Sequence, residues 1–157
     1  MEITISNCRP GKTVDPALET TVRTVLAKTA EVYGLKENTE VSVVLADDPY
    51  IHELNLQYRG KDRPTDVLSF ALNEGEEPEI VADADLTPTV LLGDIVISLE
   101  TAARQAEEYN HGLEREVAYL TVHGMMHLLG YDHETEEERE EMRGEEEHVL
   151  QLLGIGR

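Results

Sequence analysis

Apolar and polar residues along the chain follow two periods, the two-residue alternation of strands and the wider spacing of amphipathic helices. The predicted strands are Glu2–Ser6, Glu40–Ala46, Val67–Phe70 and Val90–Ser98. The predicted helices lie between Asp15 and Gly34, from Asp47 to about Tyr58, from Leu99 to about Tyr109, from near Leu113 to Leu129, and over Glu134–Leu153. Strand, helix and strand in this order at the start of the chain favour parallel pairing of the first two strands.

Two stretches interrupt this pattern. The acidic segment from Asn73 to Thr89 is predicted to be a loop with solvated carboxylates, and loops of this length are usually functional or mobile. Inside the last predicted strand, Gly93 indicates a bulge or a close approach of two backbones. Asp94 is either a residue of that bulge or a group of a site.

One predicted helix differs from the others, because the segment from Val117 to Leu129 contains no Asp, Glu, Lys or Arg. A helix that is apolar on every side is buried. The helix nevertheless carries His123 and His127, and buried imidazoles need partners because unpaired buried polar groups are costly.

A shared metal ion is the partner that the spacing favours. His123 and His127 stand four residues apart, so they lie on one helix face where both reach a single ion. A continued helix would turn His133 away, but Gly130 favours the left-handed conformation that ends helices and lets the chain fold back. Each histidine alone would be an ordinary core or surface residue. Together, His123, His127 and His133 predict one zinc ion per chain, with a fourth position left for water as in catalytic sites.

This spacing is similar to that of the metzincin proteases, H-E-x-x-H-x-x-G-x-x-H. The glutamate that acts there as general base is replaced here by Gly124. The sequence therefore keeps a metzincin-like metal helix without the proteolytic chemistry.

Composition narrows the functional classes. The 157 residues include 13 Lys+Arg against 33 Asp+Glu, a formal net charge of −20, which argues against indiscriminate nucleic-acid binding. The single cysteine, Cys8, excludes an internal disulfide and fits a reducing compartment. We expect a soluble cytoplasmic protein, because the first residues do not resemble a signal peptide and no apolar run approaches the roughly 18 residues of a membrane span.

Positive charge is nevertheless concentrated in one stretch. Arg59, Lys61 and Arg63 lie in a predicted loop where Asp62 is the only acid among them. Loop cations usually serve solubility alone, but the acidity of the rest of the chain favours a local role here, the binding of nucleic acid.

Three stretches carry a family resemblance: Tyr58–Phe70 (YRGKDRPTDVLSF), Leu92–Ile95 (LGDI) and His123–His133. In this order they resemble the YbeY family of bacterial rRNA maturation factors, over nearly the whole chain. The resemblance implies a single α/β (α+β) domain, residues 1–157, with a mixed sheet of about four strands and surrounding helices. This architecture agrees with the predicted order of elements.

The resemblance also implies a function. It predicts a zinc-dependent, single-strand-specific endoribonuclease that acts in 16S rRNA 3′-end maturation and ribosome quality control, with precursor rRNA and the ribosome or small-subunit proteins as partners. The family's three zinc-binding histidines correspond to His123, His127 and His133, and its functional arginine corresponds to Arg59.

The expected chemistry is metal-assisted phosphodiester hydrolysis, with Arg59 neutralising charge that develops on the phosphate. Because Gly124 replaces the glutamate, the general base is unassigned, and either activated water or the RNA 2′-hydroxyl is the nucleophile. Asp132 is either a turn residue or a partner of a metal ligand. Two alternative functions are a metalloprotease with an unconventional base and a metal-stabilised ribosome-assembly factor without catalysis.

Overall fold

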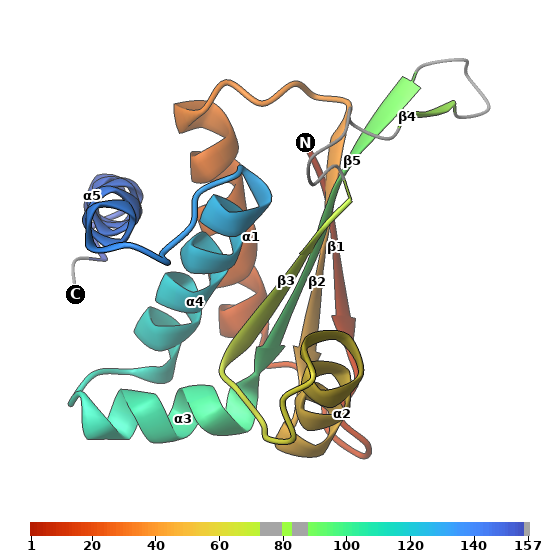
Figure 1. The fold of residues 1–157 in the computed structure, drawn as a ribbon, viewed down its shortest axis with the longest axis vertical. Helices are drawn as coiled ribbons and strands as arrows, with labels where there is room; N and C mark the ends of the chain where they lie inside the picture. Colours follow the sequence, from red (N-terminus) through yellow and green to blue (C-terminus); the bar gives the residue numbers. More distant parts are fainter. Residues whose placement is uncertain (73–79, 83–87, 156–157) are drawn as a thin grey trace.

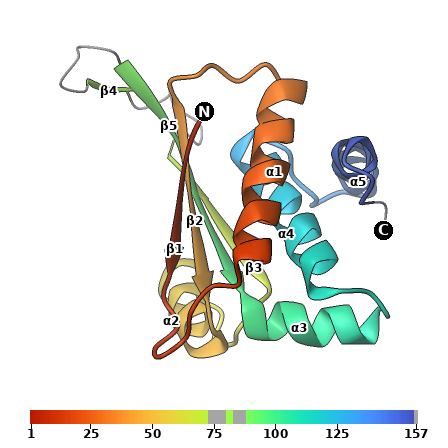
Figure 2. The same ribbon diagram turned by 180° about the vertical axis from the view of Figure 1, so that it is seen from behind.

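One mixed sheet separates two unequal helical layers in the computed structural model, which describes residues 1–72, 80–82 and 88–155 (Figure 1). Helix α2 (Asp48–Arg59) lies on one face of the sheet, and the remaining helices lie on the other face, where α5 is the outermost (Figure 2). Those helices are α1 (Pro16–Val32), α3 (Leu99–Glu108), α4 (Leu113–Leu128) and α5 (Glu136–Leu152). The strands are β1 (Glu2–Asn7), β2 (Thr39–Ala46), β3 (Val67–Ala71), β4 (Ile80–Ala82) and β5 (Pro88–Ser98).

The strand order confirms the predicted mixed sheet. The main path runs β1-β2-β5-β3, in which β1 and β5 pair with β2 in parallel and β3 pairs with β5 in antiparallel orientation. The short strand β4 pairs with the first residues of β5, which begins at Pro88 rather than at Val90. Both features fall inside the segment predicted to be a loop, and the rest of that segment, 73–79 and 83–87, lies outside the described residues.

Gly93 lies both at a bulge and at a close approach of two backbones, the two alternatives that a glycine inside a strand indicated. The register between β2 and β5 shifts beside it, as in a bulge. Its φ is +151°, and a Cβ atom there would lie 2.3 Å from the carbonyl oxygen of Phe70, so only glycine fits. Asp94 itself is in register with Ser42, whose hydroxyl bonds to its carboxyl, while burial raises the pKa of Asp94 above its usual range. By strand alternation from Val96, Asp94 faces the α2 side, away from α4.

Polar side chains begin the helices largely where the sequence indicated. The Asp15 carboxylate accepts from the Ala17 amide at 2.9 Å, and the Asp47 carboxylate accepts from the Tyr50 amide at 3.0 Å. The Ser98 hydroxyl does the same for α3. Thr135 and Glu138 form a reciprocal capping box at the start of α5, two residues later than the predicted start at Glu134.

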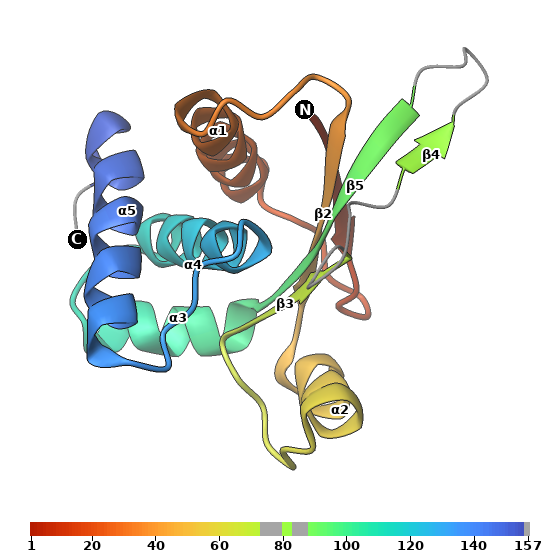
Figure 3. The ribbon, with the colours of Figure 1, turned by 45° about the horizontal axis from the view of Figure 1, so that its top comes forward.

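Helix α4 lies between the sheet and the other helices of its layer (Figure 3), and its uncharged segment from Val117 is buried as the sequence predicted. Val117 and Leu120 pack into the main core with the sheet and α1. Its other buried side packs between α1 and α5, where Val122 and Met126 join Met142 in a second cluster. Among the described residues no helix is both long and apolar enough to span a membrane.

The last turn of α5 departs from the apolar spacing of its sequence. Leu152 fits that spacing but is 53% exposed, whereas Leu150 is 2% exposed. Two residues correspond to about 200° around a helix, so the burial of Leu150 turns Leu152 to solvent.

Candidate metal centre

Three histidines from two segments meet at the end of α4. His123 and His127 stand on the last turns of that helix, and His133 lies in the connection to α5. One ligand nitrogen from each lies within 4.8 Å of the others. Because zinc binds histidine nitrogens at about 2.0–2.1 Å, small side-chain adjustments bring all three onto one ion. The structure thus brings the three predicted ligands together.

The chain reverses at Gly130 in the way the sequence predicted. Gly130 has φ +100°, and the following amide, from Tyr131, donates back to the carbonyl of Met126 at 2.9 Å. Asp132 then accepts a hydrogen bond from the backbone amide of His133 at 2.8 Å. Asp132 is exposed, so of its two readings the structure favours the turn residue.

Gly124 explains why the metzincin glutamate is absent. A Cβ atom at this position would lie 2.7 Å from the side chain of Ile95, a fully buried residue of β5. Helix α4 therefore packs tightly against β5 at Gly124. A glutamate there would point into the sheet, so this position supplies no general base.

A buried carboxylate holds the first histidine, and the sequence analysis missed it. Glu146 of α5 is 3% exposed, and its Oε1 lies 2.9 Å from His123 Nδ1. The many glutamates of α5 suggest a solvated face, which fits exposed residues such as Glu147 but not Glu146. The overlooked signal is spacing, because Glu146 falls four residues after Met142 and three before Val149, on the buried stripe of the helix.

The charge of Glu146 fits a cation at this site. Its other carboxylate oxygen is buried without a hydrogen-bond partner among the described residues. A buried carboxylate is costly unless positive charge lies close by. His123 supplies that charge only when protonated or when its Nε2 binds a cation. The donor set, three imidazoles backed by a carboxylate, is typical of zinc sites.

His127 is electrostatically suited to bind a cation. Burial, together with the neighbouring His123 and His133, lowers its pKa to about 4. The imidazole is therefore neutral near pH 7 and carries the lone pair that a metal ion needs.

Arg59 lies outside the histidine cluster. It ends α2, where one guanidinium nitrogen donates to the Ser69 carbonyl at 2.7 Å and the guanidinium carbon lies 5.6 Å from the centre of the Phe70 ring. Ser69 connects the two regions, because its hydroxyl donates at 3.3 Å to the carbonyl of Gly124, the residue that follows His123. Arg59 and α4, the helix that carries His123 and His127, thus contact the same strand, β3.

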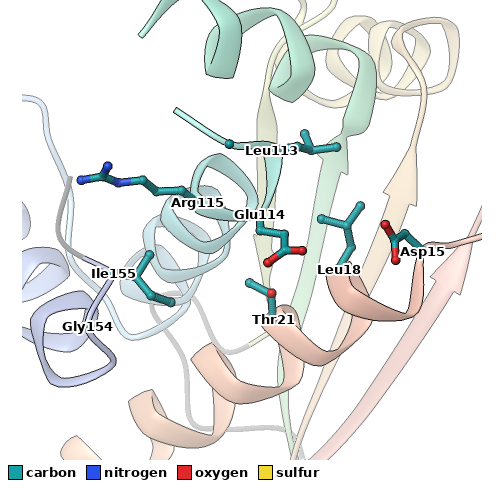
Figure 4. A pocket seen from close by; sticks show the side chains of 9 residues that line it. Asp15, Leu18, Thr21, Leu113, Glu114, Arg115, Gly154 and Ile155 are labelled. Atoms are coloured by element: carbon teal, nitrogen blue, oxygen red, sulfur yellow. The ribbon is translucent and has the colours of Figure 1, made fainter. Parts of the chain in front are cut away.

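The remaining histidines and a cavity lie elsewhere. His148 is exposed on α5, and His111, which precedes α4, forms a buried pair with Glu116. A cavity of about 530 Å³ lies at the opposite end of α4, between α1 and the residues after α5 (Figure 4). Its lining includes Asp15, Arg115 and Ile155 and none of the three clustered histidines. The candidate centre is therefore an open site at the surface and not this cavity.

Comparison with known proteins supplies independent findings. A family model described as Endoribonuclease YbeY matches residues 4–154. The chain is 52% identical over 158 residues to Endoribonuclease YbeY of Desulforamulus reducens and 51% identical over 157 residues to that of Pelotomaculum thermopropionicum, each with full coverage of both chains. The solution structure of TM1509 from Thermotoga maritima matches with a TM-score of 0.56 and 29% identity, covering 96% of this chain and 91% of that one.

Proposed function

Because this chain belongs to the YbeY endoribonuclease family, we propose that it is a zinc-dependent endoribonuclease that cleaves single-stranded RNA. The convergence of His123, His127 and His133 within 4.8 Å carries the proposal. Gly124 disfavours a metalloprotease, since the position of the metzincin base is packed against Ile95.

The residues of the site have separable roles in this reaction. Glu146 accepts the Nδ1 hydrogen of His123 and so directs the Nε2 lone pair of that ring toward the other two histidines. His123, His127 and His133 would hold the zinc ion, which would supply Lewis-acid chemistry toward water and a phosphoryl oxygen. Arg59 binds a phosphate of the RNA and stabilises the charge that develops during cleavage.

The biological setting that we propose is the maturation of the 16S rRNA 3′ end and ribosome quality control, in the cytoplasm. Precursor rRNA is the substrate, and the ribosome or small-subunit proteins are the partners. The names of the relatives support an RNA substrate. Association with the ribosome is tested by isolating ribosomes from cells that express the tagged protein and measuring whether the protein is bound to them. Unprocessed 16S rRNA 3′ ends should accumulate when the protein is depleted.

A nuclease assay tests the activity against its alternatives. Purified protein is offered single-stranded RNA, structured RNA and casein, first as prepared, then stripped of metal, then with zinc restored. Cleavage of the single-stranded RNA alone, lost with the metal and regained with zinc, is the expected result. Cleavage of casein would indicate a protease. No cleavage of either polymer by the zinc-loaded protein would indicate an assembly factor without catalysis.

Two substitutions at Arg59 test its role within the same assay. Arg59→Ala should abolish cleavage and leave zinc content and the melting temperature unchanged. Arg59→Lys should restore cleavage poorly, because lysine keeps the charge but loses the planar array of donors. Cleavage at the wild-type rate by Arg59→Ala would remove Arg59 from the mechanism and leave the metal centre standing.

A further inference from the structure

Tyr58 and Phe70 form an aromatic pair at the surface beside Arg59. Their ring centroids lie 5.4 Å apart, with the planes at 66° in an edge-to-face arrangement. Tyr58 is 60% exposed, more than any other large apolar side chain in the described part of the protein. The packing between the two rings therefore leaves most of the Tyr58 ring in contact with water.

The aromatic pair occupies the outer edge of the sheet. β3 is the last strand of the order β1-β2-β5-β3, so one of its edges has no neighbouring strand in the described structure. Phe70 packs toward the α2 face, and Ser69 on the same strand contacts Gly124 of α4. An extended ligand lying across this edge would run from the aromatic pair toward the histidine centre.

Positive charge accompanies the aromatic pair. The Arg59 guanidinium lies over the Phe70 ring, and its hydrogen bond to Ser69 uses only part of a group with five N–H donors. Lys61 and Arg63 are also exposed, while Asp62 is bonded to His52 at 2.7 Å. In a chain with a formal net charge of −20, the stretch from Arg59 to Arg63 offers a polyanion three nearby cations, while more distant acidic groups are largely screened.

We infer that Tyr58, supported by Phe70, is a base-stacking subsite in which one unpaired RNA base lies on the Tyr58 ring while Arg59 binds an adjacent phosphate. The inference rests on the proposed function and deepens it. Aromatic rings beside cations are the general means by which proteins bind single strands, because every base has a face that stacks. Bases in a duplex already stack on their neighbours, so this subsite would contribute to selectivity for single strands.

Steady-state cleavage of a short single-stranded RNA tests the subsite. Tyr58→Ala should raise KM roughly 5- to 100-fold with kcat nearly unchanged, because stacking contributes to binding before and during the reaction. Tyr58→Phe should stay within about threefold of wild type, since its ring still stacks. Tyr109→Ala, which removes another exposed tyrosine far along the chain, is the matched control and should leave KM unchanged.

A second arm identifies the base. Oligonucleotides with a single abasic nucleotide at successive positions are bound to wild type and to Tyr58→Ala. At one position the abasic nucleotide should weaken binding to wild type by the same factor as Tyr58→Ala and should have no further effect on that variant. Melting temperature and zinc content verify that both variants are folded and loaded.

The outcomes separate the subsite from the activity. If wild type cleaves RNA and Tyr58→Ala matches it in KM, the subsite is overturned. Equal abasic effects in both proteins would overturn it as well. If the zinc-loaded wild type neither binds nor cleaves RNA, the proposed function fails first.

Discussion

A buried histidine–glutamate pair stands at each end of α4, and the two pairs differ in what surrounds their histidines. At the start of the helix, His111 Nε2 lies 2.7 Å from Glu116 Oε2, and the two side chains are 6% and 1% exposed. At its end, His123 Nδ1 lies 2.9 Å from Glu146 Oε1, with 21% and 4% exposed. The contacts are chemically alike, but only the second histidine is open to solvent and joined by two others.

This difference shows that a histidine–carboxylate pair is not in itself a metal site. The His111 pair is sealed from solvent, and it ties the loop before α4 to the first turn of the helix. The His123 pair uses Nδ1, so Nε2 is the nitrogen left to bind an ion shared with His127 and His133. We infer that the groups near the second imidazole nitrogen, the one that does not contact the carboxylate, distinguish a structural pair from a metal ligand. Substitutions at matched positions of the two pairs test this interpretation.

Loss of a ligand histidine should have the largest effect. His123→Ala, His127→Ala or His133→Ala each removes one of three ligands, so zinc affinity and RNA cleavage should fall by more than the roughly 100-fold typical for loss of an outer partner. Elemental analysis of the purified variants measures the zinc. Stoichiometric zinc in all three variants would disprove the metal centre.

His111→Ala is the matched control for that experiment. It should affect stability and not zinc binding. Zinc should stay bound, while the free energy of unfolding should fall by about 3–5 kcal/mol, as when one member of a buried pair is removed. Zinc titration and denaturant unfolding of the same sample distinguish the two outcomes. If His111→Ala lost zinc and kept its stability, the His111–Glu116 pair would support metal binding as the His123–Glu146 pair does, and the proposed difference between them would be wrong.

Glu146→Gln should have the next largest effect. An amide cannot balance the charge of a cation on His123, so zinc affinity should fall about 10- to 100-fold in a folded protein. Glu147→Gln, which changes an exposed neighbour, should leave the affinity unchanged. Glu116→Gln at the other pair should lower the melting temperature without altering zinc affinity. Equal zinc affinities of Glu146→Gln and Glu147→Gln would rule out a role of Glu146 at the metal.

The sequence predicted the elements and the convergence of the three histidines because both depend on local spacing. The i, i+4 histidines and the φ requirement of Gly130 operate within eleven residues, and the strand and helix periods are equally local. Glu146 and the Glu116–His111 pair were not predicted. A glutamate on the buried stripe of a helix is visible in the sequence, but its partner is determined by how helices pack.

The same reasoning explains the two fold differences. β4 forms only because β5 extends past its neighbours and offers an edge, and a three-residue strand has no periodicity to detect. Leu152 fits the apolar spacing of α5, but the burial of Leu150 determines which side of the last turn faces inward. Such choices depend on tertiary contacts.

Metal removal should have a smaller effect on stability than the loss of the sealed pair. Helix α4 is buried in two apolar clusters that exist independently of any ion. Zinc at about 100 times its Kd stabilises the folded state by about 2.7 kcal/mol, which corresponds to a shift of roughly 5–10 °C for a domain of this size. Calorimetry before and after chelation measures the shift. A chelated protein without a cooperative transition would show that the metal site is structural.

The smallest effect is expected at Asp132, an acidic neighbour of a ligand that lies outside the core. Its Oδ1 accepts the amide of His133 and thereby fixes the turn that presents this histidine. Asp132→Ala removes one solvent-exposed hydrogen bond, worth about 0.5–1.5 kcal/mol, so zinc affinity should fall only about 2- to 10-fold. Asp132→Asn keeps an oxygen acceptor and should restore most of that affinity. A loss as large as that of Glu146→Gln, without rescue by asparagine, would mean that the charge of Asp132 acts on the ion. Glu146, a buried carboxylate that supports a ligand, and Asp132, an exposed carboxylate that shapes a turn, would then no longer differ in their effect on the metal.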